Sequence, residues 1–73
     1  MDSITSTQQQ ILSLLIEKPE KQFTIRGIAR ELGKSYPLVY NNLSKLEQNG
    51  LIIKKDIPPA KIVMLNEFAQ QDV

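Results

Sequence analysis

The sequence contains no cysteine and no histidine among its 73 residues. Their absence excludes disulfides, thiol nucleophiles, imidazole bases and the usual Cys/His zinc sites. The chain has no run of about 18 apolar residues that would cross a membrane, and it opens without the basic and apolar segments of an export leader. We therefore expect a cytoplasmic protein with no metal site, no cofactor and no membrane contact.

Motifs for catalysis are missing as well. The chain contains no glycine-rich phosphate loop and no Gly-x-Ser-x-Gly nucleophile motif, and no two acidic residues have the spacing of a catalytic dyad or a metal site. A chain of 73 residues forms one domain with a small core, which leaves little room for a buried catalytic cavity. We expect residues 1–73 to form a single domain that is not an enzyme.

The charged residues are unevenly distributed, although the formal net charge is only +1. Residues 22–65 contain seven basic and three acidic residues, which gives +4, whereas residues 1–21 and 66–73 together carry −3. A basic central region is typical of a surface that faces nucleic acid. A mixed, solvated surface would give the same counts, so charge alone leaves both interpretations open.

The first helix is expected from about residue 5 to 18. Near its start, hydroxyl residues precede glutamines three positions on, which offers a capping box in more than one register. Ile11, Leu14 and Leu15 lie at helical spacing and predict the face that is buried. Pro19 cannot continue the helix and marks its end.

Two shorter helices follow as a closely spaced pair, over residues 25–32 and 36–49. Thr24 and Ser35 are suited to cap their N-termini. A glycine follows each helix at a position that favours a left-handed C-terminal cap. A three-residue turn that contains glycine is typical of two helices set at a steep angle, so we expect a helix-turn-helix over residues 25–49.

The third helix of this set carries two rows of side chains. Val39, Leu43 and Leu46 are spaced four and three residues apart, as in a row that faces a core. Tyr36 and Tyr40 are four residues apart and lie on the opposite side. This second row needs a partner of its own, and either DNA or a protein surface would fit it.

After the third helix the sequence changes to an extended pattern rich in β-branched residues. Residues 51–55 and 61–65 are expected to form two strands, joined by a turn over Ile57-Pro58-Pro59-Ala60. Together they predict a β-hairpin over residues 51–65.

Two shorter segments complete the chain. Residues 22–24 are expected to be extended, with Phe23 directed into the core. Residues 66–73 are expected to form a polar tail, in which Asn66 is suited to cap a short helix. The predicted order is α-β-α-α-β-β, which makes the fold mainly α with a small β-hairpin.

Three stretches carry residues whose spacings occur together in one protein family. They are Thr7-Gln8 through Leu15, Phe23 through Ser35, and Val39, Leu43, Leu46, Glu47, Gly50, Leu51 and Ile52. Over about residues 7–65 the sequence resembles the winged helix-turn-helix family, and most closely its MarR-like transcription regulators. The resemblance implies a three-helix winged helix-turn-helix fold whose hairpin is the wing. It also implies sequence-specific binding of double-stranded DNA by a small transcriptional regulator.

In the resembling family the third helix lies in the major groove, which implies that the positions between its core residues face DNA. Asn41 has the amide group that bonds an adenine edge at two points. The tyrosines offer a ring for a thymine methyl and a hydroxyl for a phosphate. The implied surface consists of Ser35, Tyr36, Pro37, Tyr40, Asn41, Ser44 and Lys45, with Leu38 and Asn42 at its edge.

Basic residues outside the third helix would bind the phosphate backbone. Many DNA-binding wings carry Arg or Lys at the tip, whereas the tip at residues 57–60 is uncharged here. We therefore expect the wing lysines to contact the flanking backbone without reading the minor groove. The residues implied in backbone contact are Arg26, Arg30, Lys34, Lys54, Lys55 and Lys61.

A second interpretation stays open from the sequence. Tyr36, Leu38 and Tyr40 form a partly apolar row, and the Pro-Pro tip is uncharged, so both surfaces also suit contact with a protein partner. The chain would then be a winged-helix protein-interaction module or the N-terminal recognition domain of a larger protein. If the chain binds DNA, useful affinity is expected from a homodimer, with contacts through the first helix, Ile4 or Phe68.

Overall fold

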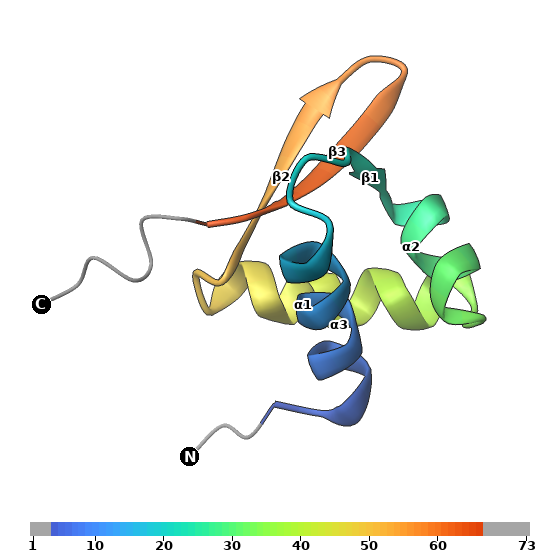
Figure 1. Ribbon diagram of the computed structural model, residues 1–73, viewed down its shortest axis with the longest axis vertical. Helices are drawn as coiled ribbons and strands as arrows, with labels where there is room; N and C mark the ends of the chain where they lie inside the picture. Colours follow the sequence, from blue (N-terminus) through green and yellow to red (C-terminus); the bar gives the residue numbers. More distant parts are fainter. Residues whose placement is uncertain (1–3, 67–73) are drawn as a thin grey trace, which may run out of the picture.

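Capping residues set the starts of the three helices in this structure, a computed structural model that describes residues 4–66 (Figure 1). The Thr5 hydroxyl accepts a hydrogen bond from the Gln8 backbone N–H over 3.2 Å, and the Gln8 side chain accepts one from the Thr5 N–H over 3.4 Å. Thr24 and Ser35 accept backbone N–H bonds at the starts of the other two helices. The elements are α1 (Ser6–Glu17), β1 (Phe23–Thr24), α2 (Ile25–Leu32), α3 (Tyr36–Gln48), β2 (Ile52–Ile57) and β3 (Ala60–Leu65).

Helices α2 and α3 form the expected helix-turn-helix, and a glycine follows each of them. Gly33 has a φ of 65° and Gly50 a φ of 78°, a left-handed conformation that glycine adopts without strain. Asn49, expected as the last residue of the third helix, is its C-terminal cap. The element order and the fold class predicted from the sequence are confirmed.

The three strands form one antiparallel sheet in the order β1-β3-β2. In β1, Phe23 pairs with Val63 of β3, so the extended segment expected before α2 is a strand of this sheet. The hairpin is longer than predicted: we expected its first strand to end at Lys55, but Ile57 still pairs with Ala60. Because only two prolines connect this last pair, the pairing continues almost to the tip.

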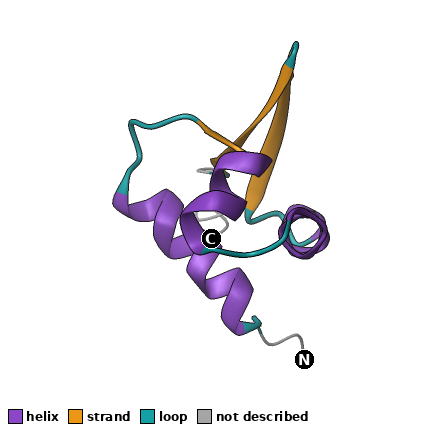
Figure 2. Ribbon diagram, turned by 90° about the vertical axis from the view of Figure 1, so that its right-hand side faces the viewer, coloured by secondary structure: helices purple, strands orange, loops and turns teal. Residues whose placement is uncertain are grey.

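The core lies between the inner face of α3 and the surrounding helices and strands. Val39, Leu43 and Leu46 are fully buried there, as their spacing predicted. Ile11 of α1 and Phe23 of β1 are buried in the same cluster. The hairpin projects beyond the helices, so its outer half adds little to this core (Figure 2).

Asn66 closes the base of the hairpin. Its N–H donates to the Leu51 carbonyl over 3.0 Å, and its Nδ2 donates to the Gly50 carbonyl over 2.9 Å. The rest of the predicted tail, residues 67–73 with Phe68 and the short helix, lies outside the described residues. Among residues 4–66, no helix has the length and apolar character needed to cross a bilayer.

Candidate nucleic-acid interface

The outward face of α3 carries most of the side chains that the sequence analysis assigned to DNA. Tyr36 is 45% exposed and Tyr40 is 42% exposed. Asn41 and Lys45 are exposed as well, because they lie between positions of the buried row. The remaining predicted positions on and before this helix are exposed, or half-buried in the last case: Ser35, Pro37, Leu38 and Ser44.

The two tyrosines form the centre of a row that links three elements, which we call the tyrosine row. The rings of Tyr36 and Tyr40 are stacked, with centroids 6.3 Å apart and planes inclined by 10°. The Arg26 guanidinium of α2 lies 5.9 Å from the Tyr36 ring centroid, and the Lys54 ammonium of β2 lies 4.9 Å from that of Tyr40. A cation over a ring face is attracted by the ring's electron distribution, so the row gives the exposed rings a preferred orientation.

Lys54 differs from the other wing lysines because its ammonium is already engaged. It lies 3.3 Å from a carboxylate oxygen of Glu47 on α3, and the Lys54 side chain is only 16% exposed. It also contacts the Tyr40 ring. The sequence analysis assigned Lys54 to the flanking phosphates, whereas the structure places its charge against α3.

Asn42 is a correction to the predicted surface. We expected it at the edge of the DNA-facing positions, but it is 9% exposed and lies on the inner face of α3. Its Oδ1 accepts hydrogen bonds from Gln8 Nε2 over 3.0 Å and from Thr5 Oγ1 over 3.3 Å. Its Nδ2 donates to the Leu38 carbonyl over 2.8 Å. These bonds compensate for burying the amide, so Asn42 belongs to the core.

Gln8 is a buried polar residue that the sequence analysis missed as part of the core. It is 4% exposed, although its neighbours Gln9 and Gln10 are exposed. A signal was present, because Gln8 precedes Ile11 by three residues and Leu15 by seven, and all three are on the buried face of α1. Asn42 has the same kind of signal, since it lies among the buried positions of α3.

The other predicted backbone contacts are distributed over the helix-turn-helix and the wing. Arg26, Arg30, Lys55 and Lys61 are exposed, and Lys34 is half-buried. Within the part of the chain that the structure describes, the side-chain ion pair of Lys54 with Glu47 is the single one found. Among these described residues, Arg26 makes a ring contact with Tyr36.

A groove of about 480 Å³ joins the helix-turn-helix to the wing tip. Arg26 and Tyr36 line it from the helices, and Lys61 lines it from β3. Lys55 does not join them. Neighbouring residues of a strand point to opposite faces, so Lys55 points away from the face on which Lys54 contacts α3. The structure thus brings one wing lysine to the helix-turn-helix side and places another on the far face of the hairpin.

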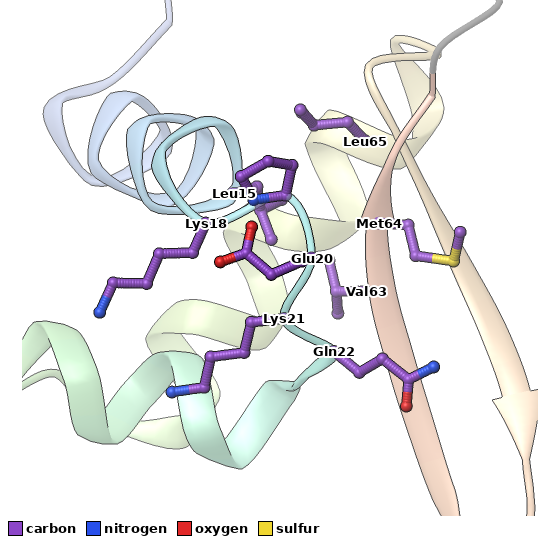
Figure 3. Close-up of a pocket in the computed structure, with 9 residues that line it drawn as sticks. Leu15, Lys18, Glu20, Lys21, Gln22, Val63, Met64 and Leu65 are labelled. Atoms are coloured by element: carbon purple, nitrogen blue, oxygen red, sulfur yellow. The ribbon is translucent and has the colours of Figure 1, made fainter.

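A cleft of about 290 Å³ lies elsewhere, between the end of α1, the following loop and β3 (Figure 3). Leu15, Val63 and Leu65 line it, but the ammonium groups of Lys18 and Lys21 extend away from β3 instead of converging on it. Residues 4–66 also gather no group of three His, Cys, Asp or Glu side chains able to hold a metal ion. The cleft is separate from the outward face of α3.

Comparison with protein families finds one match that covers most of the chain. Residues 5–54 match the family described as bacterial regulatory protein, arsR family. Comparison with the curated proteins finds no match.

The chain is similar in structure to several bacterial proteins. It aligns over 94% of its length with 52% of MepR, a transcription regulator of the Staphylococcus aureus multidrug efflux pump MepA, at 28% identity and a TM-score of 0.83. A mutant of Lactococcus lactis ZitR is 33% identical over 92% of this chain and 46% of its own, with a TM-score of 0.80. A MarR family protein from Bacillus stearothermophilus, 20% identical over 96% of this chain and 49% of its own, shares the fold with a TM-score of 0.78. The chain spans about half the length of these proteins.

Proposed function

The chain belongs to the arsR family of bacterial regulatory proteins, which are DNA-binding transcription regulators, and we propose that it recognises a specific double-stranded DNA site through α3. The observation that carries the proposal is the exposed face of α3, which presents Tyr36, Tyr40, Asn41 and Lys45 next to the wing. A mutant of MepR, whose fold aligns with this chain at a TM-score of 0.83, has been solved bound to an oligodeoxyribonucleotide. The charge of +4 over residues 22–65 favours a polyanionic partner.

We assign α3 to the major groove, which at about 12 Å wide admits one helix. In this position Asn41 would bond an adenine edge through both atoms of its amide. The Tyr40 ring would pack against a thymine methyl group. Ser35 and Ser44 would bond a base or a phosphate, and Tyr36 and Pro37 lie in the first turn, where the N–H groups of a helix favour a phosphate.

We assign the exposed cations to phosphate contacts. Arg26 and Lys61 line the groove between α2 and the wing. The other assigned residues lie outside it, on the helix-turn-helix and on the far face of the hairpin: Arg30, Lys34, Lys45 and Lys55. If about four to six phosphates are bound, the logarithm of the binding constant should fall with the logarithm of salt concentration with a slope of about −4 to −5. Lys54 would act differently, because its ammonium would hold the Tyr40 ring in place through their contact within the tyrosine row.

A single domain of this size makes few DNA contacts, so we propose that a homodimer supplies useful affinity. Its two copies would bind half-sites about one helical turn apart. The exposed apolar residues of the α1 region, Ile4 at 38% and Ile16 at 63% exposure, offer contacts outside the face of α3. We also propose that the protein acts by binding alone, without catalysis. As a bacterial transcription regulator it would work in the cytoplasm, where the chromosome lies.

Fluorescence anisotropy of a labelled duplex pool, titrated with the protein at several salt concentrations, tests this function. We expect binding in the micromolar range or tighter at low salt, with the steep salt dependence given above. A Lys18→Ala variant is a matched control, because its charge lies at the end of α1 beside the cleft of Figure 3. Absence of binding at low salt would contradict the proposal.

A protein-interaction module is the second candidate, and one observation favours it. Leu38 at 42% and Ile57 at 45% exposure add apolar area to the helix face and to the uncharged wing tip. Such area suits a protein surface better than a phosphate backbone. If the duplex titration fails, the outward face of α3 becomes the surface to use in a search for a protein partner.

A further inference from the structure

A polar cluster whose two amides, Gln8 and Asn42, are buried connects the start of α1 to the inner face of α3, and we call it the amide cluster. It consists of Thr5, Gln8, Asn42 and the carbonyl of Leu38. Gln8 Nε2 donates to Asn42 Oδ1 over 3.0 Å, and Thr5 Oγ1 donates to the same oxygen over 3.3 Å. Asn42 Nδ2 donates to the Leu38 carbonyl, one turn earlier on α3, over 2.8 Å. The Asn42 side chain, which joins the two helices, is therefore held by hydrogen bonds at both its Oδ1 and its Nδ2.

Every polar group of the two buried amides has a partner. The Gln8 amide oxygen accepts from the Thr5 N–H, and its nitrogen donates to Asn42. No buried side-chain nitrogen or oxygen in the described part of the chain lacks a hydrogen-bond partner. A fully satisfied buried network is rigid, because any displacement leaves a polar group without a partner in a medium of low polarity.

The surroundings of the amide cluster lack directional contacts. Val39, Leu43 and Leu46 flank Asn42 on the inner face of α3 and pack in an apolar cluster. Such contact is non-directional and tolerates small rotations of a helix about its axis. Hydrogen bonds have defined distances and angles, so Asn42 gives this face a preferred rotation. Polar residues in otherwise apolar helix interfaces set register in the same way in coiled coils.

We propose that Gln8 and Asn42 are positioning residues that set the rotation of α3 and so aim its outward side chains at the bases. The proposal rests on the DNA-binding function proposed above. Asn42 directly follows Asn41 and lies three residues before Lys45, so a rotation of α3 turns all three side chains together. Base contacts are more sensitive to this rotation than phosphate contacts are, because bonds to base edges require a fixed geometry.

Paired replacements separate positioning from stability. Gln8→Met and Asn42→Leu keep the side-chain lengths but remove the hydrogen bonds. When both are made, no buried amide is left without a partner, so the double variant should fold with stability near that of the parent. Urea denaturation followed by circular dichroism checks this. Gln8→Met alone is a second variant, because Asn42 Oδ1 keeps its bond from Thr5.

The binding readout is the ratio of affinities for a selected duplex and a scrambled one, measured at two salt concentrations. We expect the ratio to fall about tenfold or more in the double variant, while the affinity for scrambled DNA and the salt slope stay as in the parent. Ile28→Val is the control, because it removes a methyl group from a fully buried position of α2 outside the amide cluster. Its ratio should stay unchanged.

A second readout needs no DNA. The Lys54 ammonium lies 4.9 Å from the Tyr40 ring centroid, so the adjacent methylene protons should show a ring-current shift in the NMR spectrum. A rotated α3 would move Tyr40 away from Lys54 and reduce this shift in the double variant. A folded double variant with an unchanged shift overturns the proposal. If the parent protein binds no duplex at all, the proposed function fails, and the Lys54 shift still decides whether the amide cluster positions α3.

Discussion

The inner and outer faces of α3 differ in what holds their side chains in place. On the inner face, Val39, Leu43 and Leu46 are fully buried against the other helices and the sheet. On the outer face, Tyr36 and Tyr40 remain 45% and 42% exposed and are held by ring stacking and neighbouring cations. Burial orders the first face, whereas weak contacts that solvent still reaches order the second.

The difference in energy between these two kinds of order is large. Burial of one large aliphatic side chain contributes about 1.5–3 kcal/mol, whereas an exposed cation–ring contact contributes about 0.5–1 kcal/mol. Truncation of an aliphatic side chain on the inner face should therefore lower the free energy of unfolding. A substitution on the outer face should leave the fold intact and change what the helix binds. The predictions below test this separation.

Leu43→Ala should have the largest effect, because it opens a cavity at the centre of the inner face. We expect a loss of about 2–5 kcal/mol in the free energy of unfolding, which is a large part of the stability of so small a domain. Urea denaturation followed by circular dichroism measures it. Leu38→Ala on the same helix, at a position that is 42% exposed, is the matched control and should cost far less. A loss below about 1 kcal/mol for Leu43→Ala would contradict the assigned core.

Asn41→Ala should change binding without changing stability. We expect a loss of about 1–3 kcal/mol in discrimination between a selected site and its variants, with a change in stability within about 0.5 kcal/mol. Anisotropy titrations against a set of duplexes with single base changes give the first quantity. If Asn41→Ala and the parallel variant Tyr40→Ala both bind the selected site as the parent does, α3 does not read the bases.

The separation of the two faces also explains which features were predictable from the sequence. Helix ends depend on residues close in sequence, such as Thr24 with Gly27 or the glycine at position 33, so their bounds were predicted almost to the residue. The aliphatic row on α3 follows from helical spacing alone. The pairing of Phe23 with Val63 joins residues far apart in the chain, so the pattern of residues 22–24 gave an extended segment without its partner.

Polar residues with distant partners were the hardest to place. Asn42 is of a residue type that usually lies at the surface, and its burial depends on Gln8, 34 positions earlier in the chain. Lys54 is of a residue type that commonly binds phosphate, but Glu47 and Tyr40 on α3 engage its charge. Helical spacing alone could have placed Asn42 on the buried face of α3, but the partners of both side chains depend on which residues the folded chain brings together.

Lys45→Ala should give a smaller effect on binding, one that is independent of sequence. Lys45 is exposed on the outer face and has no ion pair within the described residues, so its charge is available to a phosphate. We expect weaker binding to all duplexes alike and a salt slope that is less steep by about 1. Lys18→Ala is the matched control and should leave the slope unchanged. An unchanged slope in Lys45→Ala would place this lysine outside the interface.

Glu47→Gln should have the smallest effect. It tests whether the ion pair with Glu47 keeps the Lys54 ammonium from binding a phosphate. The ion pair of Glu47 with Lys54 is partly exposed, so its loss should change the free energy of unfolding by no more than about 1 kcal/mol. Without the carboxylate, the Lys54 ammonium should become available to a phosphate in addition to the Tyr40 ring. We expect scrambled DNA to bind more tightly and the salt slope to steepen by up to about 1. The double variant Glu47→Gln with Lys54→Gln should cancel this gain, because the released charge is then absent. If Glu47→Gln leaves the affinity for scrambled DNA unchanged, the contact with Tyr40 alone is enough to keep Lys54 from the phosphates.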